Sequence, residues 1–368
     1  MSGDTLPEPD RIEGAPHPRE TAQLFGHAAA EARFLAAADA GRLHHGWLIT
    51  GPQGVGKATL AWRIARFLLA QDGGLLGAPG TLGIDADDPV ARRIAALSEP
   101  RLHLVRRGPN DRGDALSNEI RLPVIRELRR FLTMAPAEGG RRVVIVDAAD
   151  ELNVQAANAL LKLLEEPPAD TVLLLVSHQP SGLLPTIRSR CRELRLAGLG
   201  PDDMAAALEA AGQDDPAAAP ALAALSGGSV GAAIRLARMD GLARYRALVE
   251  TAATLPDLDR ARALALADSV AGRAAGAQLD LMLWLIELFL SRLARAGVSG
   301  PPAPEAAPGE TELFARLAPD AHAARRWAEL QQTLSARGRQ GRAVNLDPAA
   351  LVLDMVLSID AAAPSRTA

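Results

Sequence analysis

The stretch from His45 to Lys57, HGWLITGPQGVGK, decides the fold of this chain. Its first part, residues 45–50, is a short apolar run, as in a buried β-strand, and it leads directly into glycines. The G-x-x-x-x-G-K spacing that follows is typical of a phosphate-binding loop (P-loop), in which backbone N–H groups surround the phosphates and the lysine bridges them. The sequence therefore predicts a nucleotide site, with a glycine-rich turn that binds nothing as the alternative. Its residues would be Gly51, Gly54, Gly56 and Lys57.

Apolar runs alternate with helical patterns on the carboxyl side of this loop. Strands that alternate with helices are typical of a parallel α/β sheet. After about residue 199 the strand signal vanishes, and alanine-rich helical patterns follow in two pieces, 200–240 and 241–360. The chain is therefore predicted to be α/β first and all-α afterwards. The predicted strands are 102–105, 142–146 and 171–177, and the predicted helices between and before them are 28–40, 57–70, 122–134 and 154–164.

Composition excludes several classes of protein. The 368 residues are enough for about two to three domains, and 40 basic against 44 acidic residues exclude binding of nucleic acid or membrane through bulk charge. The single cysteine, Cys191, excludes an internal disulfide framework and a cysteine-based zinc site. Residues 1–20 are too polar for a signal peptide, and the apolar window 281–290 is too short to span a bilayer. We therefore expect a cytoplasmic protein without a membrane segment.

Two groups that a hydrolysing P-loop needs are missing. Ala58 follows Lys57 at the position where a Ser or Thr hydroxyl would bind Mg²⁺, and Thr59 is rotated about 100° further around the helix. Asp147 ends an apolar run at the Walker-B position, but Ala148 follows it instead of a glutamate that would polarise the attacking water. These losses predict a site without hydrolysis. Lys57 and the loop backbone leave weak binding of ATP or ADP open.

Two further motifs point to a family. Residues 158–168 read NALLKLLEEPP, and residues 186–191 read TIRSRC. In combination they resemble the delta-prime subunits of bacterial DNA polymerase III clamp loaders, which are members of the AAA+ group. The resemblance covers roughly residues 20–240, with weaker support from NLDP at 345–348.

The resemblance implies the domain organisation. We expect a flexible tail (1–18), an AAA+ P-loop α/β domain (19–198), a small helical lid domain (199–243) and an all-α collar domain for oligomerisation (244–368). A hydrolysing member of the family has a sensor-2 arginine near Gly231, which is a third missing nucleotide contact here. The family's zinc-binding cysteine cluster, expected within 71–100, is absent, so no zinc, and no metal site of any kind, is predicted.

The resemblance also gives Arg190 of TIRSRC a role. It implies that this arginine reaches into the ATP site of a neighbouring subunit and stabilises charge that develops on the γ-phosphoryl group. The alternative is a solvated arginine in a basic run with Arg188, Arg192 and Arg195. Cys191 is interpreted as a packing residue, and Lys162 either pairs with Glu166 or contacts a neighbouring subunit or DNA.

As a function, the resemblance implies a clamp-loader subunit without its own ATPase activity, in a polymerase complex whose synthesis activity lies in other subunits. The expected partners are the motor subunits gamma/tau, the delta subunit and, through the complex, the sliding clamp and primed DNA at the cytoplasmic, nucleoid-associated replisome. The alternative is an active motor that uses Thr59 or Asp150 in place of the missing groups. An unrelated P-loop kinase would leave LLKLLEEPP and SRC unexplained.

Overall fold

The computed structural model describes residues 6, 8–71, 80–134, 139–213, 215–271 and 275–364. The chain divides into two compact units. The first, which we call the α/β unit, comprises Met1–Gly212 and Gly228–Gly231, and the second, the helical unit, comprises Gln213–Gly227 and Ala232–Ala368.

The α/β unit is built on one five-stranded sheet in the order β2-β3-β4-β1-β5, and every strand pair is parallel. β1 pairs with both β4 and β5, so it lies next to the edge strand β5. Every residue of β1 and β4 is buried, as is typical of parallel strands covered on both faces. The bounds are β1 Gly46–Thr50, β2 Leu102–Arg106, β3 Arg142–Asp147, β4 Thr171–Ser177 and β5 Arg192–Arg195.

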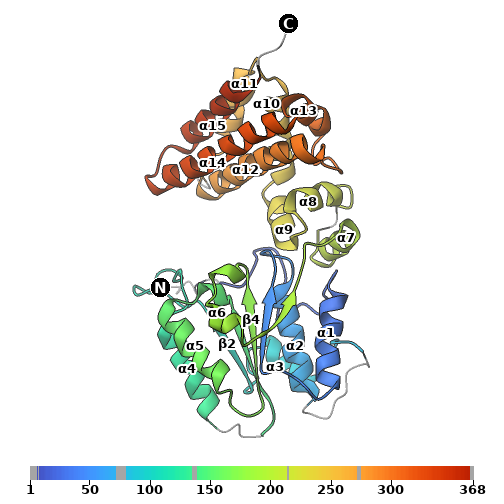
Figure 1. Ribbon diagram of the computed structural model, residues 1–368, viewed down its shortest axis with the longest axis vertical. Helices are drawn as coiled ribbons and strands as arrows, with labels where there is room; N and C mark the ends of the chain where they lie inside the picture. The colour runs from blue at the N-terminus through green and yellow to red at the C-terminus, as the bar shows by residue number, and fades with distance from the viewer. Residues whose placement is uncertain are drawn as a thin grey trace. The chain divides into compact units, whose positions relative to one another are not determined.

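Helices cover both faces of this sheet (Figure 1). α1 and α2 contact strands on one face and α3 packs on α2, while α4 and α5 pack together on the other face with α6 beside α5. Residue Asn153 caps α5 by accepting a hydrogen bond from the Ala156 N–H at 2.9 Å. The bounds are α1 Ala28–Asp39, α2 Lys57–Gln71, α3 Pro89–Ala95, α4 Leu122–Thr133, α5 Val154–Glu165, α6 Pro185–Arg188 and α7 Pro201–Ala210, with short 3₁₀ turns at Ala149–Glu151 and Pro180–Gly182.

The predicted fold class is confirmed at the level of its architecture: a parallel α/β module with a P-loop is followed by helices. Each predicted strand and helix lies within a residue or two of its predicted position. The edge strand β5 and the short helix α3 were not predicted. Within the segment 71–100, where the cysteine cluster of the family is missing from the sequence, residues 72–79 lie outside the described residues.

The described part of the expected N-terminal tail carries specific contacts; residues 1–5 and 7 lie outside the described residues. Asp10 Oδ1 lies 2.7 Å from Nη1 of Arg106, the last residue of β2, and Asp10 Oδ2 lies 3.2 Å from Nε2 of the fully buried His17. Arg19 Nη1 lies 2.6 Å from Glu8 Oε1. These contacts attach residues 8–19 to the carboxyl end of β2.

The helical unit contains α8 and most of the helices that follow it in the chain. Its two long helices, α12 and α14, pack extensively on each other. Its centre holds a buried polar cluster in which Arg292 Nη2 lies 2.8 Å from Glu310 Oε2 and the Tyr245 hydroxyl donates to Glu310. The bounds are α8 Ala219–Ser226, α9 Val230–Arg238, α10 Gly241–Ala253, α11 Arg260–Asp268, α12 Ala275–Ser299, α13 Glu310–Leu317, α14 Ala321–Ala343 and α15 Pro348–Ala362. The first residues of α9 belong to the α/β unit.

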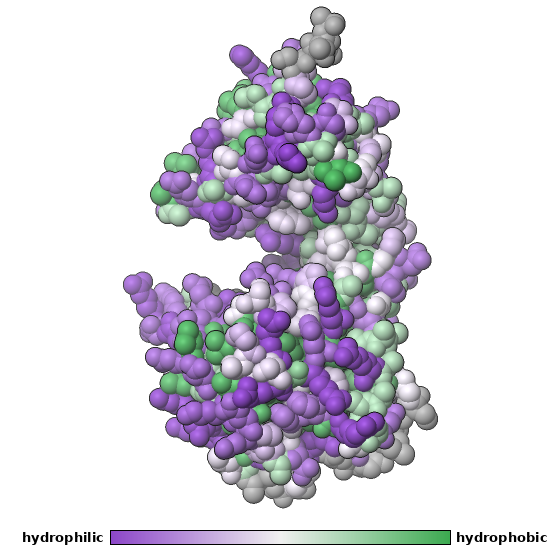
Figure 2. Space-filling model, in the orientation of Figure 1, coloured by the Kyte–Doolittle hydropathy of each residue, from purple (hydrophilic) through white to green (hydrophobic). Residues whose placement is uncertain are grey.

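The outward surface of both units is predominantly polar on the face seen in Figure 2. Within the described residues no helix is by itself long and apolar enough to cross a membrane, although the bent pair α8 and α9 meets the length and composition criteria when taken together. The predicted apolar window 281–290 lies inside α12, and its side chains are largely buried within the helical unit.

Candidate functional site

The P-loop connects the end of β1 at Thr50 to the start of α2 at Lys57, as predicted. No acceptor in the described part of the chain takes the N–H groups of Gly54, Val55 and Gly56, so these donors remain available to a phosphate. The helix N-terminus adds a partial positive charge at the same point. This part of the site fits the phosphates of a nucleotide.

The glycines of the loop are required by close packing as well as by backbone conformation. Gly51 and Gly54 both have positive φ angles, +145° and +78°. A Cβ on Gly51 would lie 2.3 Å from the carbonyl oxygen of Leu196, and one on Gly54 would lie 2.4 Å from Ser229 Oγ. Neither position accommodates a side chain.

Lys57 is folded back onto its own loop. Its Nζ donates hydrogen bonds to the carbonyl oxygens of Gly51 at 2.8 Å and Pro52 at 2.5 Å, and its side chain is buried. Burial lowers the pKa of Lys57 to about 8, although the carboxylates of Asp147 and Asp150 oppose this shift. The ammonium group is thus held by loop carbonyls, and a phosphate would have to displace these hydrogen bonds.

The Walker-B position holds a carboxyl group with a raised pKa. Asp147 is the last residue of β3, and burial, followed by the charges of Asp10 and Glu151, raises its pKa to about 7. An aspartate that is about half protonated at neutral pH is a weaker ligand for Mg²⁺ than a fully ionised one. The sequence already showed that Ala58 and Ala148 have no side-chain oxygen to offer a metal or a water. The raised pKa of Asp147 is a further feature that disfavours Mg²⁺ binding, and it is visible only in the structure.

Asp150 is already occupied by backbone donors. Its Oδ1 accepts a hydrogen bond from the His178 N–H at 2.9 Å, and its Oδ2 accepts one from the Gln179 N–H at 3.2 Å. Asp150 therefore fixes the turn after β4. Among the described residues, the imidazole Nδ1 of His178 and the hydroxyl of Ser177 are buried without a hydrogen-bond partner. The pKa of His178 is lowered mainly by burial and further by the charge of Lys57.

The sensor-2 position is packed directly on the P-loop. The N–H of Gly231 donates to the carbonyl oxygen of Gly54 at 3.1 Å, and Ser229 Oγ donates to the carbonyl oxygen of Gln53 at 2.8 Å. A Cβ on Gly231 would lie 2.5 Å from the side chain of Ile12 and 3.2 Å from the Gly54 Cα. An arginine at this position would have to displace its neighbours, so the missing sensor-2 arginine matches the local packing.

Metal ligands are not gathered in the described residues, where no three His, Cys, Asp or Glu side chains are placed to hold an ion. His44 and His45 stack on each other with ring centroids 4.3 Å apart. His45 Nε2 lies 3.0 Å from the carbonyl oxygen of Leu164, at the carboxyl end of α5. Both histidines have a structural role at the start of β1.

The TIRSRC turn forms the second part of the candidate site. α6 ends at Arg188, the Arg190 N–H donates to the Ile187 carbonyl at 3.1 Å, and β5 begins at Arg192. Arg190 Nη2 lies 2.8 Å from Glu165 Oε1, and Arg190 Nη1 donates to the Thr186 carbonyl at 3.0 Å. Arg190 is therefore a partly exposed arginine held at two points.

Arg190 and the P-loop of the same chain do not come together. Trp47 in β1 pairs with Arg192, so TIRSRC lies beside the amino end of β1, whereas the P-loop follows the carboxyl end at Thr50. Because a strand rises about 3.3 Å per residue, the length of β1 separates the two by more than 10 Å. Arg190 is therefore too far from its own P-loop to contact a nucleotide bound there.

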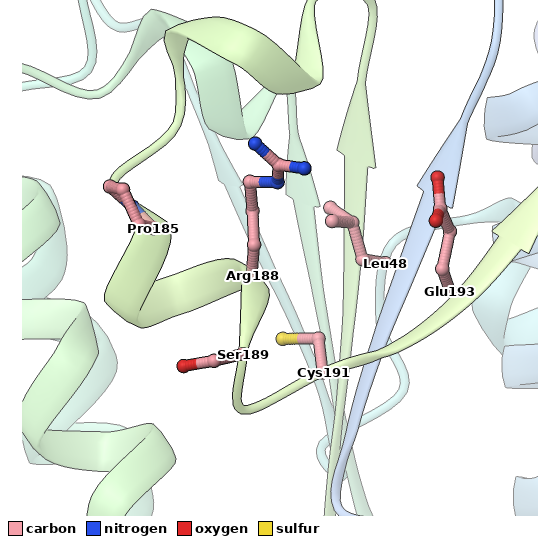
Figure 3. A pocket seen from close by; sticks show the side chains of 6 residues that line it. All are labelled: Leu48, Pro185, Arg188, Ser189, Cys191 and Glu193. Carbon is pink, nitrogen blue, oxygen red and sulfur yellow. The ribbon is translucent and has the colours of Figure 1, made fainter.

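A pocket of about 450 Å³ opens beside the same turn (Figure 3). Arg188 and Glu193 line it from α6 and β5, with Leu48 of β1 between them. Cys191 contributes a thiol whose pKa burial raises to about 12, so the thiol is neutral and unreactive. The interpretation of Cys191 as a packing residue agrees with this environment.

Other predicted residues are peripheral to both parts of the site. Lys162 is exposed on α5 and has no ion-pair partner among the described residues, so the predicted pair with Glu166 is not formed. Thr59 lies half-buried in the first turn of α2. The sequence analysis missed Asp10, whose charge raises the pKa of Asp147, and Ser229, which donates a hydrogen bond to the Gln53 carbonyl. Asp10 lies in a proline-containing tail and Ser229 follows two glycines, and neither pattern indicates a contact with a residue distant in sequence.

Part of the chain is similar to a known family. Residues 26–200 match the family described as "DNA polymerase III, delta subunit". The chain is 40% identical over 193 residues to DNA polymerase III subunit delta' of Pseudomonas aeruginosa, covering 52% of this chain and 55% of that protein. It is 34% identical over 209 residues to the delta' subunit of Bacillus subtilis, covering 56% and 58%. The match thus spans little more than half the length of these relatives.

More distant likenesses were also found. The gamma/tau subunit of Mycobacterium tuberculosis is 32% identical over 198 residues, covering 52% of this chain and 31% of that protein. Among solved structures, a gamma-subunit-related protein of Thermotoga maritima aligns with a TM-score of 0.35 at 17% identity, over 90% of this chain and 99% of that one. The clamp loader delta protein of Bacillus subtilis aligns with a TM-score of 0.33 at 11% identity, over 89% and 99%.

Proposed function

We propose that this chain, whose residues 26–200 match the family described as "DNA polymerase III, delta subunit", is a non-hydrolysing clamp-loader subunit of the delta-prime type. In this proposal it assembles with the motor subunits gamma or tau and with delta, and it donates Arg190 to the ATP site of a neighbour. The complex would load the sliding clamp on primed DNA at the replisome in the cytoplasm. Residues 199–243 and 244–368 would act as the lid and the collar through which the subunits join.

The observation that carries the proposal is the separation of Arg190 from its own P-loop along β1. An exposed guanidinium that is held at two points but is remote from its own nucleotide site suits action across a subunit boundary. There it would stabilise negative charge on the γ-phosphoryl group of a neighbour, an effect worth about 10³–10⁵ in rate for arginine fingers in general.

The state of the P-loop supports the non-hydrolysing part of the proposal. Lys57 is hydrogen-bonded to loop carbonyls, and Asp147 has a pKa of about 7. In this proposal, ATP or ADP would be held weakly by Lys57 and the free N–H groups of the loop, without a catalytic Mg²⁺. Nucleotide bound here would supply no chemistry of its own, and turnover would occur only at the motor subunits.

The active-motor alternative is less well supported. It needs Asp150 to take over a catalytic role, but both oxygens of this carboxylate accept hydrogen bonds from the backbone of the turn after β4. It also needs Thr59 to reach a metal from a position about 100° around α2.

The test is the Arg190→Ala variant in a complex reconstituted with the motor and delta subunits of the same organism. We expect normal assembly by gel filtration and a loss of at least about tenfold in ATPase activity stimulated by clamp and primed DNA. Arg188→Ala is the matched control, since it removes a neighbouring arginine of the same turn. Full turnover by the Arg190→Ala complex would overturn the trans role.

A further inference from the structure

Glu165 and Arg190 form an ion pair that connects the LLKLLEEPP helix to the TIRSRC turn. Glu165 is the last residue of α5, and its Oε1 lies 2.8 Å from Arg190 Nη2. On the other side of the guanidinium, Nη1 donates to the Thr186 carbonyl at 3.0 Å. The guanidinium is thus bound by a carboxylate on one nitrogen and by a backbone oxygen on the other.

The framework around this pair is rigid. Leu163 and Leu164, directly before Glu165, are buried in the core, and the Leu164 carbonyl lies 3.0 Å from His45 Nε2 at the start of β1. The Arg190 backbone is fixed by its N–H, which donates to Ile187 at 3.1 Å, and Ile187 is fully buried. Glu165 therefore approaches Arg190 from a fixed direction.

The pair itself is open to solvent, with 37% of the Arg190 side chain and 42% of the Glu165 side chain exposed. Ion pairs this exposed contribute little to folding stability. What such a pair does change is the freedom of a long arginine side chain, since the guanidinium is held in one orientation before any ligand arrives. Restricting a reacting group in advance lowers the entropic cost of reaching the reactive geometry.

We propose that Glu165 is the positioning residue of Arg190: it holds the guanidinium in the orientation from which it enters the neighbouring ATP site. The inference rests on the trans role proposed for Arg190. Glu165 touches neither nucleotide nor reacting atoms, and it acts only through the arginine. Nη1 donates to the Thr186 carbonyl and lies 3.5 Å from Ser189 Oγ, so the N–H of Nη2 that does not face Glu165 is the donor left for a phosphate.

The chain offers matched controls for both members of the pair. Glu166 follows Glu165 in the same motif and is exposed, and Arg188 lies two residues before Arg190; within the described residues neither has an ion-pair partner. Arg188 instead lines the pocket beside α6 (Figure 3). A general effect of charge on this surface would therefore appear equally in Glu166→Gln and Arg188→Ala.

The experiment uses the reconstituted clamp-loader complex and measures steady-state ATP turnover stimulated by clamp and primed DNA. Glu165→Gln is expected to lower kcat about tenfold with little change in the KM for ATP, because orientation matters most in the transition state. Glu165→Asp should recover part of the loss, and Glu166→Gln should match the wild type. Assembly and thermal unfolding should be unchanged in all three variants.

A double-mutant cycle separates this inference from the proposal on which it rests. If Glu165 acts only through Arg190, the Glu165→Gln/Arg190→Ala complex is as slow as Arg190→Ala and no slower. Wild-type or faster turnover by Glu165→Gln, beside a slow Arg190→Ala, would overturn the positioning role and leave the trans arginine standing. A double variant slower than Arg190→Ala would also overturn it. Normal turnover by Arg190→Ala would instead reject the trans arginine itself.

Discussion

The carbonyl oxygen of Arg190 lies 3.2 Å from the point where a Cβ on Gly46 would stand, at the first residue of β1. The P-loop begins at the other end of the same five-residue strand. One strand thus separates the residue proposed to act on a neighbour's nucleotide from the loop that would hold the chain's own nucleotide. The two halves of the candidate site can be tested separately.

The isolated chain is expected to release no phosphate from ATP above background. Lys57 is bound to loop carbonyls, and no side chain of Ala58 or Ala148 can bind Mg²⁺ or activate water. A phosphate-release assay on the chain alone, beside Lys57→Met, measures this directly. Hydrolysis that disappears in Lys57→Met would identify the chain as a motor and contradict the prediction.

Asp147→Asn is expected to stabilise the protein at pH 8 by on the order of 1–3 kcal/mol. The pKa of Asp147 is raised from 3.8 to about 7, so the native state keeps a proton that the unfolded state releases. The contribution of this carboxyl group to the free energy of unfolding is therefore fully present below about pH 4, and it is lost as the pH rises through about 7. The variant removes that decline.

Urea unfolding at pH 5, 6, 7 and 8 measures the effect of Asp147→Asn. Asp268→Asn, which changes an exposed aspartate at the end of α11, serves as its control and should leave the pH dependence as it is. Parallel pH profiles for the wild type and Asp147→Asn would show that the carboxyl group is not perturbed.

Gly231→Ala is expected to lower the free energy of unfolding by about 1–3 kcal/mol. The added methyl group would meet Ile12 at 2.5 Å and the Gly54 Cα at 3.2 Å, and so disturb the contact of residues 228–231 with the P-loop. Gly276→Ala in α12 meets nothing within 4 Å and should be neutral or stabilising, because alanine favours helix. Equal thermal unfolding midpoints for the two variants would show that this contact is loose.

Arg292→Met is expected to destabilise the helical unit by about 3–5 kcal/mol, because it leaves the carboxylate of Glu310 buried without its cation. Glu310 is fully buried and also accepts the Ala306 N–H at 2.8 Å. The exposed pair Arg337–Asp354 provides the comparison: Arg337→Met should cost less than about 1 kcal/mol. Denaturant unfolding followed by circular dichroism measures both, and similar losses would contradict the special role of the buried pair.

The order of elements in the α/β unit could be predicted because its strands are continuous apolar runs. β1 and β4 are buried on both faces, and α5 and α2 carry apolar residues at helical spacing. β5 escaped prediction because its sequence, RELR, has only Leu194 buried. β5 is held in the sheet by its backbone pairing with β1. An edge strand of this kind needs few buried side chains, so its sequence shows no hydrophobic alternation from which a strand could be predicted.

The candidate site was predicted where it is local in sequence and missed where it is not. The P-loop residues and Asp147 follow from spacing after apolar strands. The contacts of Asp10 with Arg106 and of Ser229 with Gln53 join segments about 100 and 176 residues apart, and they depend on the completed fold. The raised pKa of Asp147 also depends on the completed fold, because its causes are burial and the nearby charges of Asp10 and Glu151.

The edge strand β5 also limits how this protein can associate with others. Arg192, Glu193 and Arg195 are exposed on it, so a second strand that approached this edge would face charged side chains instead of an open backbone ladder. Growth of the sheet from one molecule into the next is disfavoured at this edge, which protects the protein from fibril-like aggregation through it. A neighbour that arrives there has to be recognised by side chains.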